Sequence, residues 1–216
     1  MVKVKLCGNQ TLEDVQLTSG ADAQGFIVMA DSSREIDPEK AAELIQEVPL
    51  FTTSVLVTTV TDPLLIADMV EVLVPDALQV HVELTPIKIE RIRRALETRT
   101  RLYPVLGIGE DLEAAKANAL RMAESDVDGL LLDSRVGVKM GGTGETHRWD
   151  ISAAICELLE PLPVILAGGI TPENVIEAIK TVQPYAIDLA SGIETDGKKD
   201  AVKIEALLKQ VRQYEY

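Results

Sequence analysis

The sequence has few cysteines, no long apolar run and no charged-then-apolar leader. Two cysteines, Cys7 and Cys156, are too few among 216 residues for a disulfide framework. No apolar stretch reaches the roughly 20 residues that span a bilayer, and the first residues alternate like a strand. We therefore expect a cytoplasmic protein that does not cross a membrane. Cys156 lies in a helical pattern over residues 151–160, where a structural thiol is the ordinary interpretation.

Positive charge is also scarce. Lys and Arg total 21 against 35 Asp and Glu, which gives a formal net charge of -14. Such a chain repels phosphate backbones and anionic lipids, so neither nucleic acid nor a membrane is an expected partner. An anionic small ligand is still compatible with this charge. Its site must then be built from local amide dipoles and one or two cations.

The sequence contains eight repeats of one unit, in which a short apolar run precedes an amphipathic segment. The apolar runs predict strands at residues 2–7, 23–29, 53–58, 77–82, 102–108, 128–133, 163–168 and 186–191. The amphipathic segments predict helices at residues 11–18, 37–48, 62–73, 85–99, 111–124, 151–160, 171–182 and 200–213. Several helices open with Asp-Pro or Thr-Pro, as expected of a capping residue followed by proline at the first helical position.

Strict alternation of strand and helix predicts an α/β fold with a parallel sheet, either an open doubly wound sheet or a closed barrel. Eight units favour the closed barrel, a (βα)8 TIM barrel. At about 27 residues per unit the connecting loops must be short for this fold. We find no linker or low-complexity segment, and we expect one domain over residues 1–216.

In such barrels the chemistry takes place at the carboxyl ends of the strands. The side chains expected there are Cys7, Arg34, His81 and Asp133. The same positions carry small residues that let a backbone approach a ligand closely. These are Gly168, Gly169, Ser191 and Gly192, with a further glycine-rich stretch that includes Gly141 and Gly142.

Short motifs at these strand ends carry a family resemblance that runs from one end of the chain to the other. The motifs are "KLCG" (5–8), "GADAQGFI" (20–27), "SSREIDPE" (32–39), "QVH" (79–81), "LLLDS" (130–134), "GGTGETHRWD" (141–150), "LAGGITPENV" (166–175) and "IDLASGIETDGKKD" (187–200). With them the chain resembles the phosphoribosylanthranilate isomerase family, single (βα)8 barrels of the tryptophan pathway. The last motif is the most specific.

The chain departs from the family pattern at several positions. Asn9 and Gln10 replace the usual residues after Cys-Gly, and Val82 replaces the usual glycine after His81. Residues 29–31 lack the aromatic and basic neighbours that are usual before Arg34. The departures fall mostly on the half of the site that would bind the aromatic part of the substrate.

The resemblance implies an Amadori rearrangement of an aminoaldose 5-phosphate, with one acid, one base and neither metal nor cofactor. In this pattern Cys7 is the base. Lys5 lies on the same strand face, and we expect its ammonium to help lower the thiol pKa. Lys3 shares that face, which makes mere packing of Cys7 the weaker alternative. Asp133 closes an apolar run and is the candidate acid, with a capping or loop-tying carboxylate as its alternative.

The resemblance also implies roles in substrate binding. Arg34 would hold the anthranilate carboxylate, unless it is a solvated arginine beside Glu35. His81 either binds substrate or lines the cavity as a hydrogen-bonded group, and His147 is more simply structural. Asp126 and Asp128 are interpreted as turn residues at the opposite rim. The phosphate would be bound by amides of the loops at Gly168–Gly169 and Ser191–Gly192, with Gly141 and Gly142 folding over the ligand.

Two alternatives to the isomerase stay open at this point. One is a paralogous sugar-phosphate isomerase that acts on another aminoaldose phosphate. The other is a non-catalytic binder of a phosphorylated ligand, since a fold alone does not establish activity. In each case the expected partner is a phosphorylated small molecule, and the chain is a monomer or a homodimer.

Overall fold

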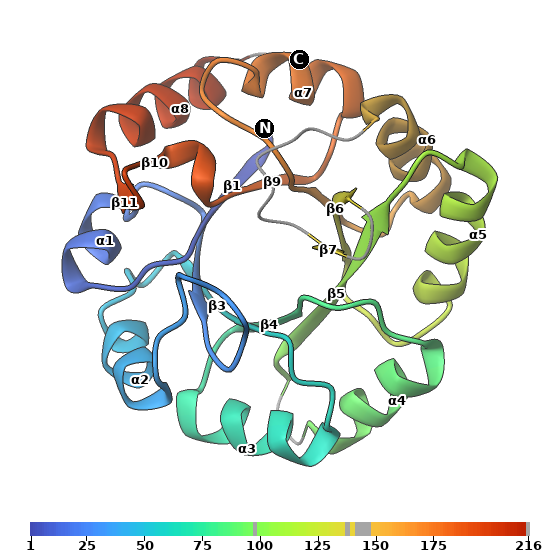
Figure 1. Cartoon of the computed structure of the whole chain (residues 1–216), viewed down its shortest axis with the longest axis horizontal. Coiled ribbons are helices and arrows are strands. Elements are labelled where there is room, and N and C mark those ends of the chain that lie inside the picture. The colour runs from blue at the N-terminus through green and yellow to red at the C-terminus, as the bar shows by residue number, and fades with distance from the viewer. Residues whose placement is uncertain (97–98, 137–138, 141–147, 215–216) are drawn as a thin grey trace.

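The predicted barrel is confirmed by the computed structural model, which describes residues 1–96, 99–136, 139–140 and 148–214. Eight strands form a closed parallel barrel, because β9 pairs with β1 as well as with β8, and β5 pairs with β6. Helices surround this ring of strands (Figure 1). Parallel pairing brings the carboxyl ends of all barrel strands to one rim.

Each predicted strand and helix is found; β3 has the predicted ends, and the ends of the others differ by up to a few residues. The barrel strands are β1 (Lys3–Cys7), β2 (Ala23–Ile27), β3 (Thr53–Thr58), β4 (Ala77–Val80), β5 (Arg101–Ile108), β6 (Leu130–Val136), β8 (Val164–Leu166) and β9 (Ala186–Leu189). The helices are α1 (Leu12–Leu17), α2 (Pro38–Gln46), α3 (Pro63–Leu73), α4 (Pro86–Ala95), α5 (Leu112–Ala123), α6 (Trp149–Leu159), α7 (Val175–Val182) and α8 (Ala201–Gln213). Among the described residues no helix has the length and apolarity to cross a membrane.

Three pieces of structure were not predicted. Strand β7 (Lys139–Met140) pairs antiparallel with the end of β6. Ser191, expected at a strand end, instead begins the short 3-10 helix η1 (Ser191–Ile193). After it, β10 (Glu194–Thr195) and β11 (Lys198–Lys199) form a hairpin. All three lie after the carboxyl ends of barrel strands, on the rim where the site is expected.

Capping side chains explain where most helices begin. Asp37, Asp62 and Thr85 each accept a hydrogen bond from a backbone N–H of the first turn, and proline follows each of them. Helix α7 differs from the prediction, because Thr171 precedes a turn and the helix begins only at Val175. The side chain of Asn174 does not cap this helix. It accepts a hydrogen bond from the Thr171 N–H in the preceding loop, at 2.8 Å.

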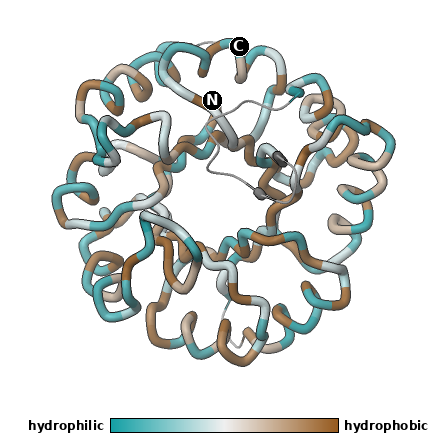
Figure 2. The backbone as a smooth tube through the Cα atoms, in the orientation of Figure 1, coloured by the Kyte–Doolittle hydropathy of each residue, from teal (hydrophilic) through white to brown (hydrophobic). Residues whose placement is uncertain are grey.

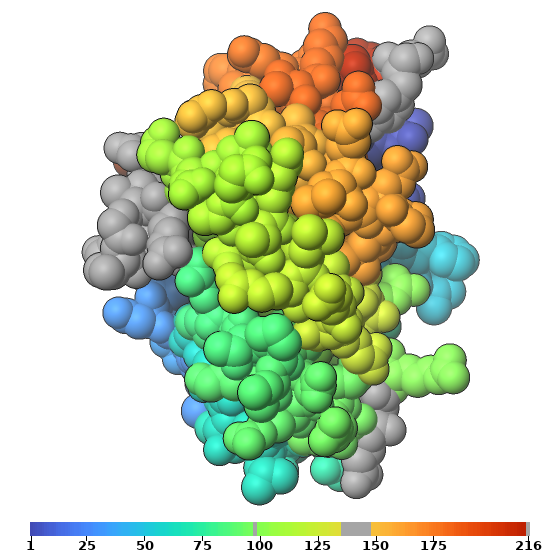
Figure 3. All heavy atoms as spheres, turned by 90° about the vertical axis from the view of Figure 1, so that its right-hand side faces the viewer, coloured from blue at the N-terminus to red at the C-terminus, as the bar shows by residue number. Residues whose placement is uncertain are grey.

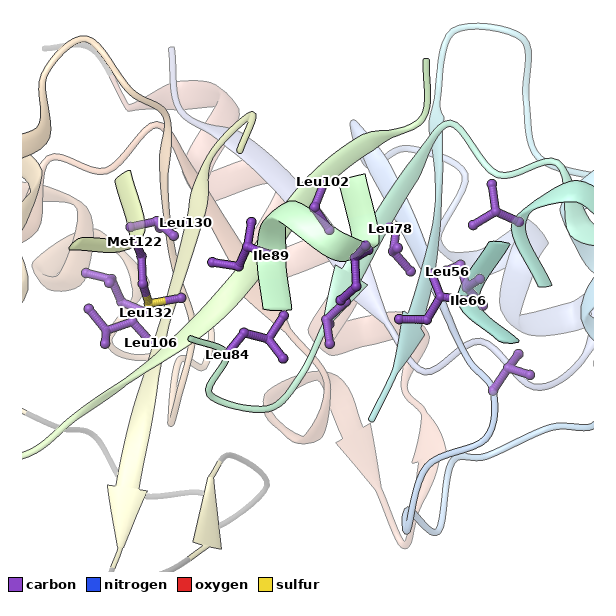
Figure 4. Packing of buried hydrophobic residues seen from close by; sticks show 14 of the residues in the cluster. Leu56, Ile66, Leu78, Leu84, Ile89, Leu102, Leu106, Met122, Leu130 and Leu132 are labelled. Carbon is purple, nitrogen blue, oxygen red and sulfur yellow. The ribbon is translucent and has the colours of Figure 1, made fainter. Parts of the chain in front are cut away.

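Successive side chains of each strand point to opposite sides of the barrel wall, so the core has an outer and an inner layer. One side of each strand faces the helices, and apolar side chains fill that space as two large clusters. In Figure 4, Ile66 of α3 and Ile89 of α4 lie among Leu56, Leu78 and Leu102 of the strands. The strands are accordingly the apolar inner ring in Figure 2, and the side view in Figure 3 shows α4 and α5 as a continuous covering. The other side of each strand points into the barrel.

Three aspartates connect adjacent strands at the amino-terminal rim of the barrel. Asp22, Asp76 and Asp128 each accept a hydrogen bond from a backbone N–H of an adjacent strand. Asp128 also pairs with Arg93, as does Asp126. The interpretation of Asp126 and Asp128 as structural turn residues therefore agrees with their contacts.

Lys3 belongs to this amino-terminal rim as well, where it pairs with Asp22 at 3.0 Å and its side chain is 51% exposed. The prediction that Lys3 and Cys7 face one reaction cavity was therefore wrong. The strand runs too far, at about 3.3 Å per residue, for Lys3 to reach the rim where Cys7 lies.

Candidate active site

A cavity of about 250 Å³ opens at the carboxyl ends of the barrel strands. Every described residue that the sequence marked for the site lines it. These residues are Cys7, Arg34, His81, Asp133, Gly168, Gly169, Ser191 and Gly192. Gly141, Gly142 and His147 lie outside the described residues. Strand geometry thus brings together residues that are up to 185 positions apart in the chain (192 minus 7).

Cys7 is the last residue of β1, and its side chain is buried at the inner end of the cavity. Gly25 on the neighbouring strand makes room for it, because a Cβ at Gly25 would come within 2.7 Å of Sγ. Burial raises the pKa of the Cys7 thiol above its ordinary value. The Lys5 ammonium acts in the opposite direction but does not outweigh the burial. Lys5 thus lowers the thiol pKa as expected, but the net direction is upward because burial has the larger effect.

Lys5 lies one layer deeper in the barrel, and its ammonium also binds two further side chains. Its Nζ donates to Asp188 Oδ2 at 2.6 Å and to Gln79 Oε1 at 2.8 Å. Lys5 and Asp188 are direct neighbours in the β1–β9 register, and both side chains are less than a tenth exposed. Although burial disfavours the charged amine, Asp188 is the main cause of a raised Lys5 pKa, so Lys5 stays an ammonium. Asp188 also lines the cavity.

Asp133 projects from β6 toward the same cavity, with a side chain 7% exposed. Its Oδ1 accepts a hydrogen bond from the Ser134 N–H at 2.7 Å. Its Oδ2 lies 3.4 Å from His81 Nε2, and His81 Nδ1 lies 2.9 Å from Gln79 Nε2. Asp133 is therefore neither a helix cap nor exposed, and one of its oxygens faces the cavity beside His81.

Arg34 is bound by a carboxylate that the sequence did not suggest. Its guanidinium makes a bidentate pair with Glu194 of β10, with Nη2 to Oε2 at 2.6 Å. Lys199 of β11 donates to the same carboxylate at 2.9 Å and to the Cys7 carbonyl at 2.6 Å. Arg34, Glu194 and Lys199 together carry one net positive charge. We call these three residues the cationic cluster.

Two loops with small residues lie against each other at the far side of the cavity. Gly168 follows β8 with φ of 85°, and a Cβ there would come within 2.8 Å of Asp133 Oδ1. Only glycine adopts this backbone without strain. A Cβ at Gly192 would meet the Ile170 carbonyl at 1.9 Å, so η1 and the loop after β8 are in direct contact. Their backbones can approach one ligand together.

The sequence interpretation missed Gln79, Asp188, Glu194 and Lys199. A signal was present for Asp188, because a carboxylate inside the apolar run 186–189 needs a buried cation. Glu194 and Lys199 lie in the most specific family motif, residues 187–200, but the motif assigned no role to either of them. They belong to a hairpin 160 residues beyond Arg34. Among the described residues, no group of three or more His, Cys, Asp or Glu side chains could hold a metal ion.

Comparison with known proteins gives one consistent result. Residues 4–210 match the family model for N-(5'-phosphoribosyl)anthranilate (PRA) isomerase. N-(5'-phosphoribosyl)anthranilate isomerase 1 of Methanosarcina mazei is 40% identical, with 97% of this chain and 94% of the relative aligned.

Solved structures are similar over nearly the whole chain. A phosphoribosyl anthranilate isomerase in complex with reduced 1-(o-carboxyphenylamino)-1-deoxyribulose 5-phosphate has a TM-score of 0.82 at 31% identity, covering 99% of this chain and 100% of that one. Monomers generated from the dimeric enzyme of Thermotoga maritima have a TM-score of 0.83 at 30% identity, with the same coverage.

Proposed function

Because the chain belongs to the N-(5'-phosphoribosyl)anthranilate isomerase family, we propose that Cys7 is the base and Asp133 the acid of its reaction. The chain is an enzyme of tryptophan biosynthesis, an isomerase that converts N-(5'-phosphoribosyl)anthranilate into 1-(o-carboxyphenylamino)-1-deoxyribulose 5-phosphate. The observation that carries the assignment is the shared cavity. A buried thiol on β1 and a carboxyl on β6 both line it.

The reaction requires that the ring oxygen of the sugar gains a proton and that carbon 2 loses one. Asp133 protonates the ring oxygen, and the bond between that oxygen and carbon 1 opens to give an iminium cation. Cys7, as the thiolate, then removes the proton from carbon 2, and the resulting enolamine rearranges to the aminoketose. The iminium charge favours the thiolate, which offsets part of the effect of burial on Cys7. Each positioned acid or base contributes about 10²- to 10⁴-fold to the rate.

The remaining groups bind the two anionic ends of the substrate. The phosphate is held by backbone amides of the loop at Gly168–Gly169 and of η1 at Ser191–Gly192. The cationic cluster holds the anthranilate carboxylate, with Arg34 as the contacting side chain. Local dipoles and one net positive charge thus serve a chain whose formal net charge is -14. This placement rests on the cavity lining and on the family's substrate.

The protein acts in the cytoplasm and as a homodimer in this proposal, with residues 1–216 as one domain. The dimer is supported by an exposed apolar surface before β3 and β4. We call Leu50, Phe51, Val72 and Val74 the amino-end patch. Leu50 and Phe51 are 89% and 96% exposed, and Leu50 lines a hollow with Val72 and Val74. Large exposed apolar side chains grouped in this way are typical of interfaces. A structural relative is described as dimeric.

A direct assay tests the proposed activity. Purified protein is mixed with N-(5'-phosphoribosyl)anthranilate, and the loss of the substrate's fluorescence is followed with time. We expect saturable turnover that ends in the aminoketose. The departures before Arg34 and at Val82 motivate the paralogous sugar-phosphate isomerase as the second candidate. Folded protein that leaves the fluorescence unchanged but isomerises another aminoaldose phosphate would establish that candidate.

A further inference from the structure

A row of polar contacts crosses the barrel from Asp188 to Asp133 through three intervening side chains. Asp188 pairs with Lys5, Lys5 donates to Gln79, Gln79 contacts His81, and His81 contacts Asp133. Period-2 alternation explains the geometry, because Gln79 and His81 are two positions apart and both point into the barrel. The row thus connects the proposed acid with a buried ion pair that the reaction itself does not use.

The orientation of the Gln79 amide is fixed by its neighbour. The Lys5 ammonium has three N–H donors and no acceptor. The Gln79 atom that lies 2.8 Å from Lys5 Nζ must therefore be the carbonyl oxygen. The NH2 group of Gln79 consequently faces His81 Nδ1 at 2.9 Å. Since Asp188 holds Lys5 in its charged form at 2.6 Å, the amide has no equally favourable flipped state.

A donor at this position decides where the proton of His81 lies. Nδ1 has to accept from the Gln79 NH2 group, so it carries no proton, and the neutral ring then has its proton on Nε2. His81 Nε2 lies 3.4 Å from Asp133 Oδ2. We propose that Gln79 is a positioning residue that holds His81 as the neutral Nε2–H tautomer, so that His81 donates to Asp133.

The inference rests on the proposed role of Asp133 as the acid. Once Asp133 has given its proton to the substrate, its Oδ2 carries negative charge and receives the His81 N–H. A hydrogen bond that strengthens as charge develops lowers the barrier and raises kcat.

The groups around Gln79 and His81 come from four other strands. They are Lys5 and Cys7 on β1, Tyr103 on β5, Asp133 on β6 and Asp188 on β9. Lys5 and Asp188 compensate each other, and Tyr103 and Cys7 are neutral when protonated. Among the described residues, Asp133 is thus the carboxylate whose contact with His81 depends on which ring nitrogen carries the proton.

The test combines spectroscopy with kinetics. The chain has two histidines, so an H147Q variant assigns the imidazole nitrogen signals in a ¹⁵N spectrum. We expect the wild type to show His81 protonated on Nε2 and not on Nδ1. In Gln79→Met the donor is lost, the two tautomers mix, and kcat falls by roughly 10- to 100-fold with KM nearly unchanged. In Gln79→Glu the side chain accepts from Nδ1–H, and kcat falls at least as far.

Gln24 gives a matched control. It is a fully buried glutamine that bonds the Val15 carbonyl and Thr18 away from the cavity. Gln24→Met should lower stability without changing the His81 signals or kcat. A wild-type spectrum with the proton on Nδ1 overturns the inference, whether or not the variants fold. So does a kcat within twofold of wild type in folded Gln79→Met. An inactive wild type with the expected spectrum rejects the proposed reaction and keeps the tautomer assignment.

Discussion

Cys7 and Asp133 are both buried, and each can be replaced by a side chain of nearly the same size. Cys7 lies against Gly25 and the interior cluster, and Asp133 makes a local bond with the Ser134 N–H. Removing the chemistry of either side chain therefore changes few packing contacts. The proposed roles of these two residues can therefore be tested separately from stability.

We expect Cys7→Ser and Asp133→Asn each to lower kcat by about 10²- to 10⁴-fold. Both replacements conserve volume, so the melting temperature should change little. The measurements are the fluorescence assay and thermal unfolding by circular dichroism. If either variant keeps a rate near that of the wild type, that side chain is not the acid or base.

The raised pKa of Cys7 predicts how its reactivity depends on pH. Only the thiolate reacts with iodoacetamide, and a free thiol has a pKa of about 8.5. Because burial favours the neutral thiol in the folded protein, the alkylation rate of Cys7 should have its midpoint above that pH.

The experiment uses a Cys156→Ser variant, so that Cys7 is the one thiol left. Burial raises the pKa of Cys156 to about 12, which agrees with a structural thiol in α6. A midpoint below pH ~8 would mean that Lys5 and Lys199 outweigh burial, and it would contradict a raised thiol pKa.

At the scale of elements, the β10–β11 hairpin completes the site. It brings Glu194 and Lys199 to Arg34, and the Lys199 side chain is only 2% exposed. Glu194 alone would neutralise Arg34. With Lys199 present the cationic cluster keeps one net positive charge, which in the proposed function binds the substrate carboxylate.

We expect Lys199→Met to raise KM by about tenfold with a smaller change in kcat. The cluster then has no net charge, and a charge-assisted hydrogen bond is worth roughly 1.5–3 kcal/mol. Lys203→Met is the control, because Lys203 donates to the backbone carbonyl of Glu194 and not to its carboxylate. An unchanged KM in Lys199→Met would show that Lys199 does not set the charge at the substrate carboxylate.

At the scale of the whole molecule, the cavity and the amino-end patch lie on opposite rims of the barrel. The cavity occupies the carboxyl ends of the strands, and the amino-end patch lies at the loops that enter β3 and β4. A symmetric dimer formed through the amino-end patch leaves both cavities open.

We expect the wild type to sediment with the mass of two chains and the double variant Leu50→Ser, Phe51→Ser with the mass of one. Loss of the apolar side chains removes the interface, and kcat should stay near the wild-type value. Val202→Ser is the control, since Val202 is 76% exposed on α8, outside the amino-end patch. A wild type that sediments as a single chain at micromolar concentration would contradict the dimer.

The sequence alone determined the order of elements, the closed barrel and the strand ends that carry the site. Alternation of apolar residues is a local property, and the side-chain direction along a strand follows from it. That is why local patterns were enough to place Cys7, His81 and Asp133 at one rim. The motifs added the family, and the family model confirms it.

Only the tertiary structure decided which groups meet. Lys5 faces Asp188 because the barrel closes β9 onto β1, and Arg34 meets Glu194 because a hairpin follows η1. The pKa direction of Cys7 depends on how deeply the thiol is buried, which no local pattern states. Charges and hydrogen bonds act through space between residues far apart in the chain, and their balance is therefore set by the fold.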